Sequence, residues 1–185
     1  MAACLALALT GCLLEPPTEE DLAEVGAGLT RPGPWSLPAD VRRAGEAQYI
    51  AYDGATRWDG GAHCSGGIKT GTRQLGEYLM SRFGQIRSYG GYSCRPNTGD
   101  TSQMSVHGTG RAIDVMIPTE HGDADNGAGD PVANWLVEHA EQLGVQYIIW
   151  DRTSWGGYRS GRKDAPYTGP IPHIDHLHVE LTIAA

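Results

Sequence analysis

The sequence lacks a basic run and a long apolar run. Among its 185 residues, 14 lysines and arginines face 22 aspartates and glutamates, for a formal net charge of −8. This acidic balance argues against nucleic acid as the main partner, because a phosphate backbone is bound through clustered positive charge. No apolar run reaches the roughly 18 residues that a membrane-spanning helix needs. The glycines form neither a phosphate-binding loop with Gly-Lys-Ser/Thr nor a collagen repeat.

The composition that remains suits one ordinary folded domain. Apolar residues make up 40% of the chain and charged residues 19%, which permits a packed core and argues against general disorder. Glycine (26) and proline (11) are abundant. We therefore expect many turns and long, ordered loops.

The N-terminal segment has a character of its own. Leu9-Thr10-Gly11-Cys12 resembles a lipobox, the bacterial signal in which the cysteine is acylated and becomes the mature N-terminus. We expect residues 1–12 to be a lipoprotein signal peptide with Cys12 lipidated, residues 13–38 to be a Pro/Glu-rich tether, and residues 39–185 to be the domain. The alternative for the leader is a plain secretory signal. We expect the domain in the cell envelope, at the periplasmic or extracytoplasmic face, anchored to a membrane by its lipid.

Two cysteines, Cys64 and Cys94, remain for the mature domain. In an exported protein a lone pair favours a disulfide. A loop of about 30 residues closed in this way would stabilise the fold by roughly 3 kcal/mol. A metal-binding pair is the alternative, but neither cysteine occurs in a CxxC or CxxH spacing.

Hydrophobic periodicity predicts an α+β fold. Apolar residues recur at helical spacing in residues 39–52, 72–83 and 131–143, the last helix capped by Asp130 with Pro131 at its first position. Strand patterns occupy residues 85–89, 111–117, 145–150 and 176–182, and long loops occupy residues 56–71, 90–107 and 152–172. Helices before and between such strands predict a small, mostly antiparallel sheet with flanking helices.

Histidines and acids gather in two stretches, SVHGTGRAID at residues 105–114 and PHIDHLHVE at residues 172–180. Asp114 lies on an otherwise apolar strand, where an unpaired carboxylate would be costly and a bound metal would remove the cost. His176 and His178 are two residues apart on a strand, so both point to one face. Three protein ligands with the fourth position left to water are typical of catalytic zinc. The residues themselves thus predict a zinc site built from His107, Asp114 and one of His176 and His178.

These stretches resemble a known family. SVHGTGRAID matches the SxHxxGxAxD signature of zinc peptidoglycan peptidases of the D-alanyl-D-alanine carboxypeptidase and L-alanyl-D-glutamate endopeptidase group, and DHLH matches their second motif. Their fold is shared with the hedgehog signalling domain. GYSCRPN at residues 91–97 is similar to secreted bacterial relatives with an extensin-like C-terminal domain. The resemblance covers about residues 41–181.

The resemblance implies a hedgehog/DD-peptidase-like fold and the zinc ligands His107, Asp114 and His178. It also implies that Asp175 acts as the general base and that His176 stabilises the oxyanion. On a regular strand Asp175 would face away from both histidines of the pair, so we expect it in the turn before the strand. His173 is the alternative base.

Two further residues are candidates for substrate binding. Arg95 corresponds to an arginine that precedes the first zinc motif in the relatives, and a guanidinium fits a carboxylate with two parallel hydrogen bonds. An ordinary surface arginine is the alternative. Ser105 would either bind substrate or only cap its turn.

The expected function is that of a zinc metallopeptidase cleaving peptidoglycan stem peptides, of the D,D-carboxypeptidase or endopeptidase type. The alternative is a zinc-containing lipoprotein that binds the cell wall without turnover. The expected partners are stem peptides and, through the lipid anchor, a membrane. We expect a monomer.

Overall fold

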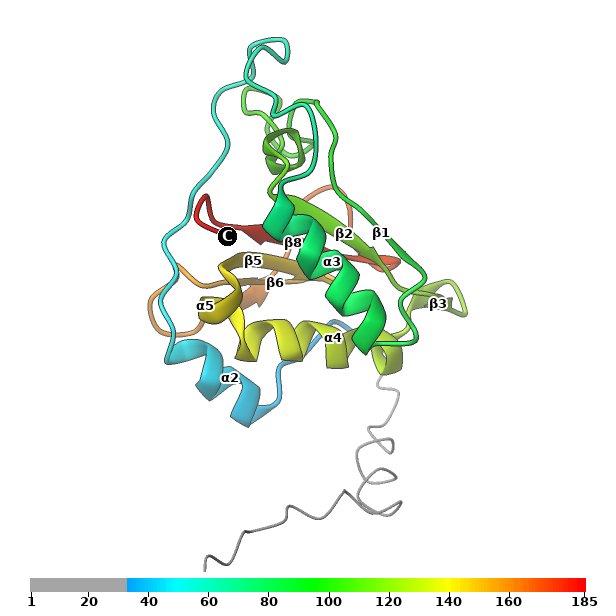
Figure 1. The fold of residues 1–185 in the computed structure, drawn as a ribbon. Coiled ribbons are helices and arrows are strands. Elements are labelled where there is room, and N and C mark those ends of the chain that lie inside the picture. Colours follow the sequence, from blue (N-terminus) through cyan, green and yellow to red (C-terminus); the bar gives the residue numbers. More distant parts are fainter. Residues whose placement is uncertain (1–32) are drawn as a thin grey trace, which may run out of the picture.

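The computed structural model describes residues 33–185 (Figure 1). The expected signal peptide, with Cys12, and most of the expected tether lie outside the described residues. The helices are α2 (Ala39–Glu46), α3 (Thr70–Arg82), α4 (Asn126–Glu138) and α5 (Ala140–Leu143), with a 3₁₀ helix η1 (Val106–Thr109). Within residues 33–185, no helix has both the length and the apolar character needed to cross a membrane.

One six-stranded sheet organises the domain, with strand order β1-β2-β8-β5-β6-β7 and every pairing antiparallel. Its strands are β1 (Ser88–Gly90), β2 (Ala112–Met116), β5 (Val145–Trp150), β6 (Thr153–Gly156), β7 (Asp164–Pro166) and β8 (His176–Leu181). A separate small ribbon joins β3 (Thr119–Glu120) to β4 (Asp123–Ala124). The expected α+β class with an antiparallel sheet is confirmed.

The sheet has an apolar face and a polar face, and β8 shows why. Its side chains alternate between the faces because a strand has a period of two residues. Leu177, Val179 and Leu181 belong to the buried core, on the face that α3 and α4 cover (Figure 1). His176 and His178 point to the other face, which the helices leave open.

Helix α4 begins earlier than the sequence predicts, and Asp130 does not cap it. The Asp125 carboxylate accepts a hydrogen bond from the Ala128 backbone amide at 2.9 Å, which makes Asp125 the N-cap. Asp130 instead accepts a hydrogen bond from the Trp150 indole at 2.8 Å, so Pro131 lies inside the helix. The predicted start was wrong because Asp125, five residues earlier, is also a good capping residue and takes the N-cap position.

The segment 152–172, expected to be a loop, contributes β6 and β7 to the sheet. All four residues of β6 are buried. A strand buried on both faces lacks the alternation of polar and apolar residues by which a half-buried strand is recognised.

The packed domain begins before Ala39. Trp35 and Leu37, which the sequence analysis assigned to the tether, are 2% and 4% exposed in the core. The Trp35 indole donates to the Asn134 side chain at 3.0 Å, and the Trp35 backbone carbonyl accepts from the Thr153 hydroxyl at 2.8 Å. Through these two hydrogen bonds the segment around Trp35 links α4 to β6.

The contact between α4 and β5 allows a test of the packing. Replacing glycine by alanine in an exposed helix stabilises it by about 1 kcal/mol. A methyl group on Gly129, however, would come within 2.1 Å of the Trp150 ring. We expect Gly129→Ala to lower the free energy of unfolding in urea by about 1–3 kcal/mol. Gly84→Ala, which meets no atom within 4 Å, is the control, and equal stability of the two variants would contradict this packing.

Candidate metal centre

His107 is carried by η1, and a glycine ends that turn. Gly110 has φ +72°, and a Cβ there would come within 2.2 Å of the Gly67 carbonyl oxygen, so only glycine fits. The Gly110 amide donates to the His107 carbonyl at 3.0 Å. The turn lies before β2 and leaves His107 only 4% exposed.

The two other donors come from neighbouring strands. Asp114 on β2 is the direct partner of His178 on β8 in the antiparallel register. Residues paired in this way have side chains on the same face at close range. Both side chains thus meet on the open face of the sheet.

Three donor atoms form a compact triangle. The His107 Nε2 lies 3.1 Å from the His178 Nδ1 and 3.3 Å from the Asp114 Oδ1, and the latter two atoms are 3.1 Å apart. Tetrahedral zinc with bonds of about 2.0 Å places its ligand atoms roughly 3.3 Å apart. The triangle fits one face of such a coordination shell, and two imidazoles with a carboxylate are a donor set that zinc accepts.

The second nitrogen of each imidazole is also held. The His107 Nδ1 donates to the Gly91 carbonyl at 2.6 Å, and the His178 Nε2 lies 3.0 Å from the Glu180 Oε1. Metal-binding histidines nearly always donate their other N–H to a carbonyl or carboxylate. Glu180 was not predicted as a site residue, although it follows His178 by two residues on the same strand and therefore shares its face.

The charges within the triangle support one another. Burial alone would raise the pKa of Asp114, but the hydrogen bonds and charges of His107 and His178 hold that pKa well below its usual range. Burial likewise opposes a charge on His178, yet hydrogen bonds to Asp114 and Glu180 raise its pKa to about 9. The triangle is thus an environment that stabilises positive charge, which is what a divalent cation would supply.

The triangle lies in a cavity of about 520 Å³. Most of the residues predicted from the sequence line this cavity, namely Arg95, Ser105, His107, Asp114, His173, His176 and His178. Tyrosines from separate segments also contribute to its wall, namely Tyr52, Tyr147, Tyr158 and Tyr167. The structure therefore brings two distant sequence clusters, and Arg95 with them, into one site.

Asp175 is located differently. It lies directly before β8, as expected, but its side chain is 57% exposed and it is not among the residues lining the cavity. Its Oδ1 accepts a hydrogen bond from the His176 Nδ1 at 2.7 Å. The opposite ring nitrogen of His176, Nε2, lies 3.9 Å from the Asp114 carboxylate. Asp175 is thus linked to the centre through the ring of His176.

His173, the alternative base, is on the cavity wall. Its Nδ1 donates to the Ile171 carbonyl at 2.5 Å. Burial, together with the charges of His178 and His176, lowers its pKa to about 4. At neutral pH His173 is therefore an uncharged ring.

The two substrate-binding candidates differ in their contacts. One Arg95 nitrogen donates to the Thr98 hydroxyl at 2.9 Å and to the Pro96 carbonyl at 3.2 Å, which fixes the guanidinium at the cavity. Ser105 is 4% exposed, and its side chain makes no capping bond to η1. Capping the turn is thus not the role of its hydroxyl.

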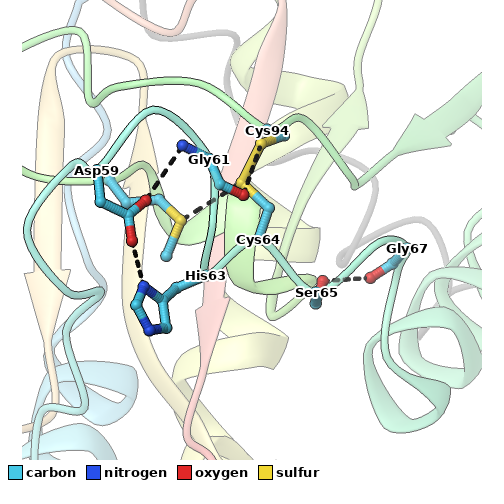
Figure 2. The surroundings of a disulfide bond; sticks show 8 residues. Asp59, Gly61, His63, Cys64, Ser65, Gly67 and Cys94 are labelled. Carbon is cyan, nitrogen blue, oxygen red and sulfur yellow. Dashed lines mark hydrogen bonds and ion pairs between the residues drawn. A yellow bond between two sulfur atoms is a disulfide. The ribbon is translucent and has the colours of Figure 1, made fainter.

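A disulfide joins Cys64 to Cys94, with their Cα atoms 5.7 Å apart (Figure 2). Both flanking loops touch the His107 turn. The Ser65 amide donates to the Gly108 carbonyl at 2.9 Å, and the Ser93 amide donates to the His107 carbonyl at 3.4 Å. The bridge thus joins the two loops that hydrogen-bond to the turn carrying His107.

Peptide mapping of the non-reduced protein, made in an oxidising compartment, should find Cys64 and Cys94 in one linked pair. Replacing both by serine should lower the free energy of unfolding by about 2–4 kcal/mol. Urea unfolding of the wild type under reducing conditions should match that of the double variant. Two free thiols in the oxidised preparation would refute the bridge.

The donor triangle predicts one zinc per chain. We expect His107→Ala, Asp114→Ala and His178→Ala each to lose the metal after dialysis, because a three-ligand site cannot spare a ligand. The matched control is His63→Ala, a histidine whose side chain is 74% exposed and paired with Asp59 outside the cavity. Metal analysis showing full zinc in any of the three variants would remove that residue from the ligand set.

Comparison with protein families matches residues 64–178 to the family described as VldE, C-terminal domain. The matched stretch begins at Cys64 and ends at His178, so it contains the disulfide and all three donors. No curated protein and no solved structure matches the chain. The match spans more than half of the sequence, and the chain therefore belongs to the VldE C-terminal domain family.

Proposed function

We propose that this protein is a zinc metallopeptidase that hydrolyses peptide bonds in peptidoglycan stem peptides. The observation that carries the proposal is the triangle of His107, Asp114 and His178 donor atoms, 3.1–3.3 Å apart in an open cavity. The likeness of residues 105–114 and 175–178 to the motifs of zinc D-alanyl-D-alanine carboxypeptidases and L-alanyl-D-glutamate endopeptidases supports the same assignment. On this basis we also assign the α+β domain to the hedgehog/DD-peptidase type of fold.

Zinc held by the three donors would lower the pKa of a water ligand to about 7 and polarise the scissile carbonyl. The chain's own groups would handle the protons. Asp175 accepts the proton of the attacking water and passes it to the leaving amine. His176 donates a hydrogen bond to the carbonyl oxygen as that oxygen becomes negative.

The contact between Asp175 and His176 links these two roles. Because the carboxylate oxygen accepts from Nδ1 at 2.7 Å, the proton of a neutral His176 is held on Nδ1 and Nε2 is left free. A second proton on Nε2 would make His176 a donor towards the cavity. Asp175 therefore also orients the ring, and an amide at position 175 would keep the orientation without accepting a proton.

The cavity walls fit a peptide that ends in carboxylates. Arg95 presents a guanidinium already fixed by Thr98, and guanidinium groups pair well with carboxylates. The tyrosines that line the same cavity provide apolar surface for the stem. Such a substrate places the domain in the cell envelope, in agreement with the disulfide and with anchoring through Cys12.

The alternative is a zinc-containing protein that binds the cell wall without turnover. The specific observation in its favour is that Asp175 does not line the cavity, although the relatives require a carboxylate at the reacting bond. Purified domain incubated with muropeptides, followed by mass analysis of the products, separates the two functions. Shortened stem peptides or split cross-links support the peptidase, whereas intact muropeptides support the binding protein.

Substitutions at the pair should uncouple activity from metal binding. We expect Asp175→Ala to keep zinc and the fold but to lose about 100- to 10,000-fold in turnover. His176→Ala should lose about 100- to 1,000-fold, as removal of an oxyanion donor does. Asp40→Ala, which removes an exposed carboxylate on α2, should leave turnover unchanged.

The conservative variant Asp175→Asn decides how the carboxylate acts. If Asp175 is the proton acceptor, Asn should be as inactive as Ala. If turnover survives in Asp175→Asn but not in Asp175→Ala, Asp175 acts by orienting His176. Full activity of Asp175→Ala together with loss in His173→Ala would transfer the base role to His173.

A further inference from the structure

Glu180 is a buried carboxylate next to the donor triangle. It lies on β8, two residues after His178, and is 6% exposed. One oxygen, Oε1, lies 3.0 Å from the His178 Nε2. The other, Oε2, has no hydrogen-bond partner among the described residues.

Burial of this carboxylate is costly. Burying a charged group with an unpaired oxygen costs free energy, and an apolar side chain at the same position would avoid that cost. The guanidinium of Arg111, the residue just before β2, attracts it through its charge but forms no hydrogen bond with it. It donates instead to the backbone carbonyls of Leu181, Asp53 and Gly54.

The contact with His178 does give the carboxylate a role. A neutral imidazole carries one proton, and only the nitrogen without the proton can bind a metal. The His178 Nδ1 faces the other two donors at 3.1 Å each. An acceptor behind Nε2 holds the proton there and leaves the lone pair of Nδ1 pointing into the triangle.

His107 and His178 each have an acceptor behind the ring nitrogen that points away from the triangle, but the two acceptors differ in kind. His107 presents Nε2 to the triangle because the Gly91 carbonyl, which can only accept, holds the proton on Nδ1. His178 presents the opposite nitrogen and needs its acceptor on the opposite side. No backbone carbonyl takes this role, and a side-chain carboxylate does so instead.

We propose that Glu180 is a positioning residue that fixes the proton of His178 on Nε2 and so commits Nδ1 to the metal. Glu180 also lines the cavity, but its direct contact with the centre is the one with His178, and the proposed role is exerted through that ring. The inference rests on the proposed zinc site.

Zinc affinity measured by competition with a chelator tests the proposal on the full chain. We expect Glu180→Ala to weaken zinc binding by about 10- to 100-fold. Glu180→Gln should recover most of that loss, because its amide oxygen still accepts from Nε2. The matched control is Asp164→Asn, an equally buried carboxylate on β7 that pairs with Arg42 and Arg162. It should lose stability but keep wild-type zinc affinity.

A second measurement needs no variant. Nitrogen NMR of the zinc-loaded wild type should show His178 protonated at Nε2 and metal-bound at Nδ1. The reverse assignment, or unchanged zinc affinity in folded Glu180→Ala, would overturn the role of Glu180 while leaving the metal centre intact. A wild-type chain that binds no zinc would instead overturn the proposed function, and this inference with it.

Discussion

The register between β2 and β8 is the constraint on which the site depends. Asp114 and His178 are 64 residues apart in the chain and become neighbours only because they are paired across these strands. A slip of one residue would turn His178 to the helix-covered face and bring Leu177 or Val179 into the site. The same slip would expose core residues, so the apolar packing that stabilises the domain also holds the donors in place.

The third donor is attached by other means. His107 is on no strand, and its turn is held by a left-handed glycine, by backbone hydrogen bonds from residues on both sides, and by the disulfide behind them. The sheet thus supplies two donors through its register, and the third comes from a turn that is hydrogen-bonded to the two disulfide-linked loops. These two kinds of support are independent of each other.

The strands and donors that could be predicted from the sequence are those marked by a pattern within a few neighbouring residues. The apolar run of β5 and the alternation of β2 and β8 mark those strands, and the two histidine clusters mark the donors. Strand β6, buried on both faces, has no alternation, and the start of α4 was decided by competition between two aspartates. Trp35 was assigned to the tether because its burial depends on Asn134, which is 99 residues away. Glu180 is the exception: the strand period places it on the face of His178, and this local signal was not used.

The central place of β8 has a consequence for the order in which the centre can be made. In the sequence β8 follows every other strand of the sheet, yet it lies between β2 and β5. Until it emerges from the ribosome, the β1-β2 pair and the β5-β6-β7 group have no common edge. Contacts between distant segments of this kind form slowly. A nascent chain therefore carries two unjoined half-sheets and an incomplete donor set, and the hydrolytic centre proposed here can arise only after β8 has been synthesised.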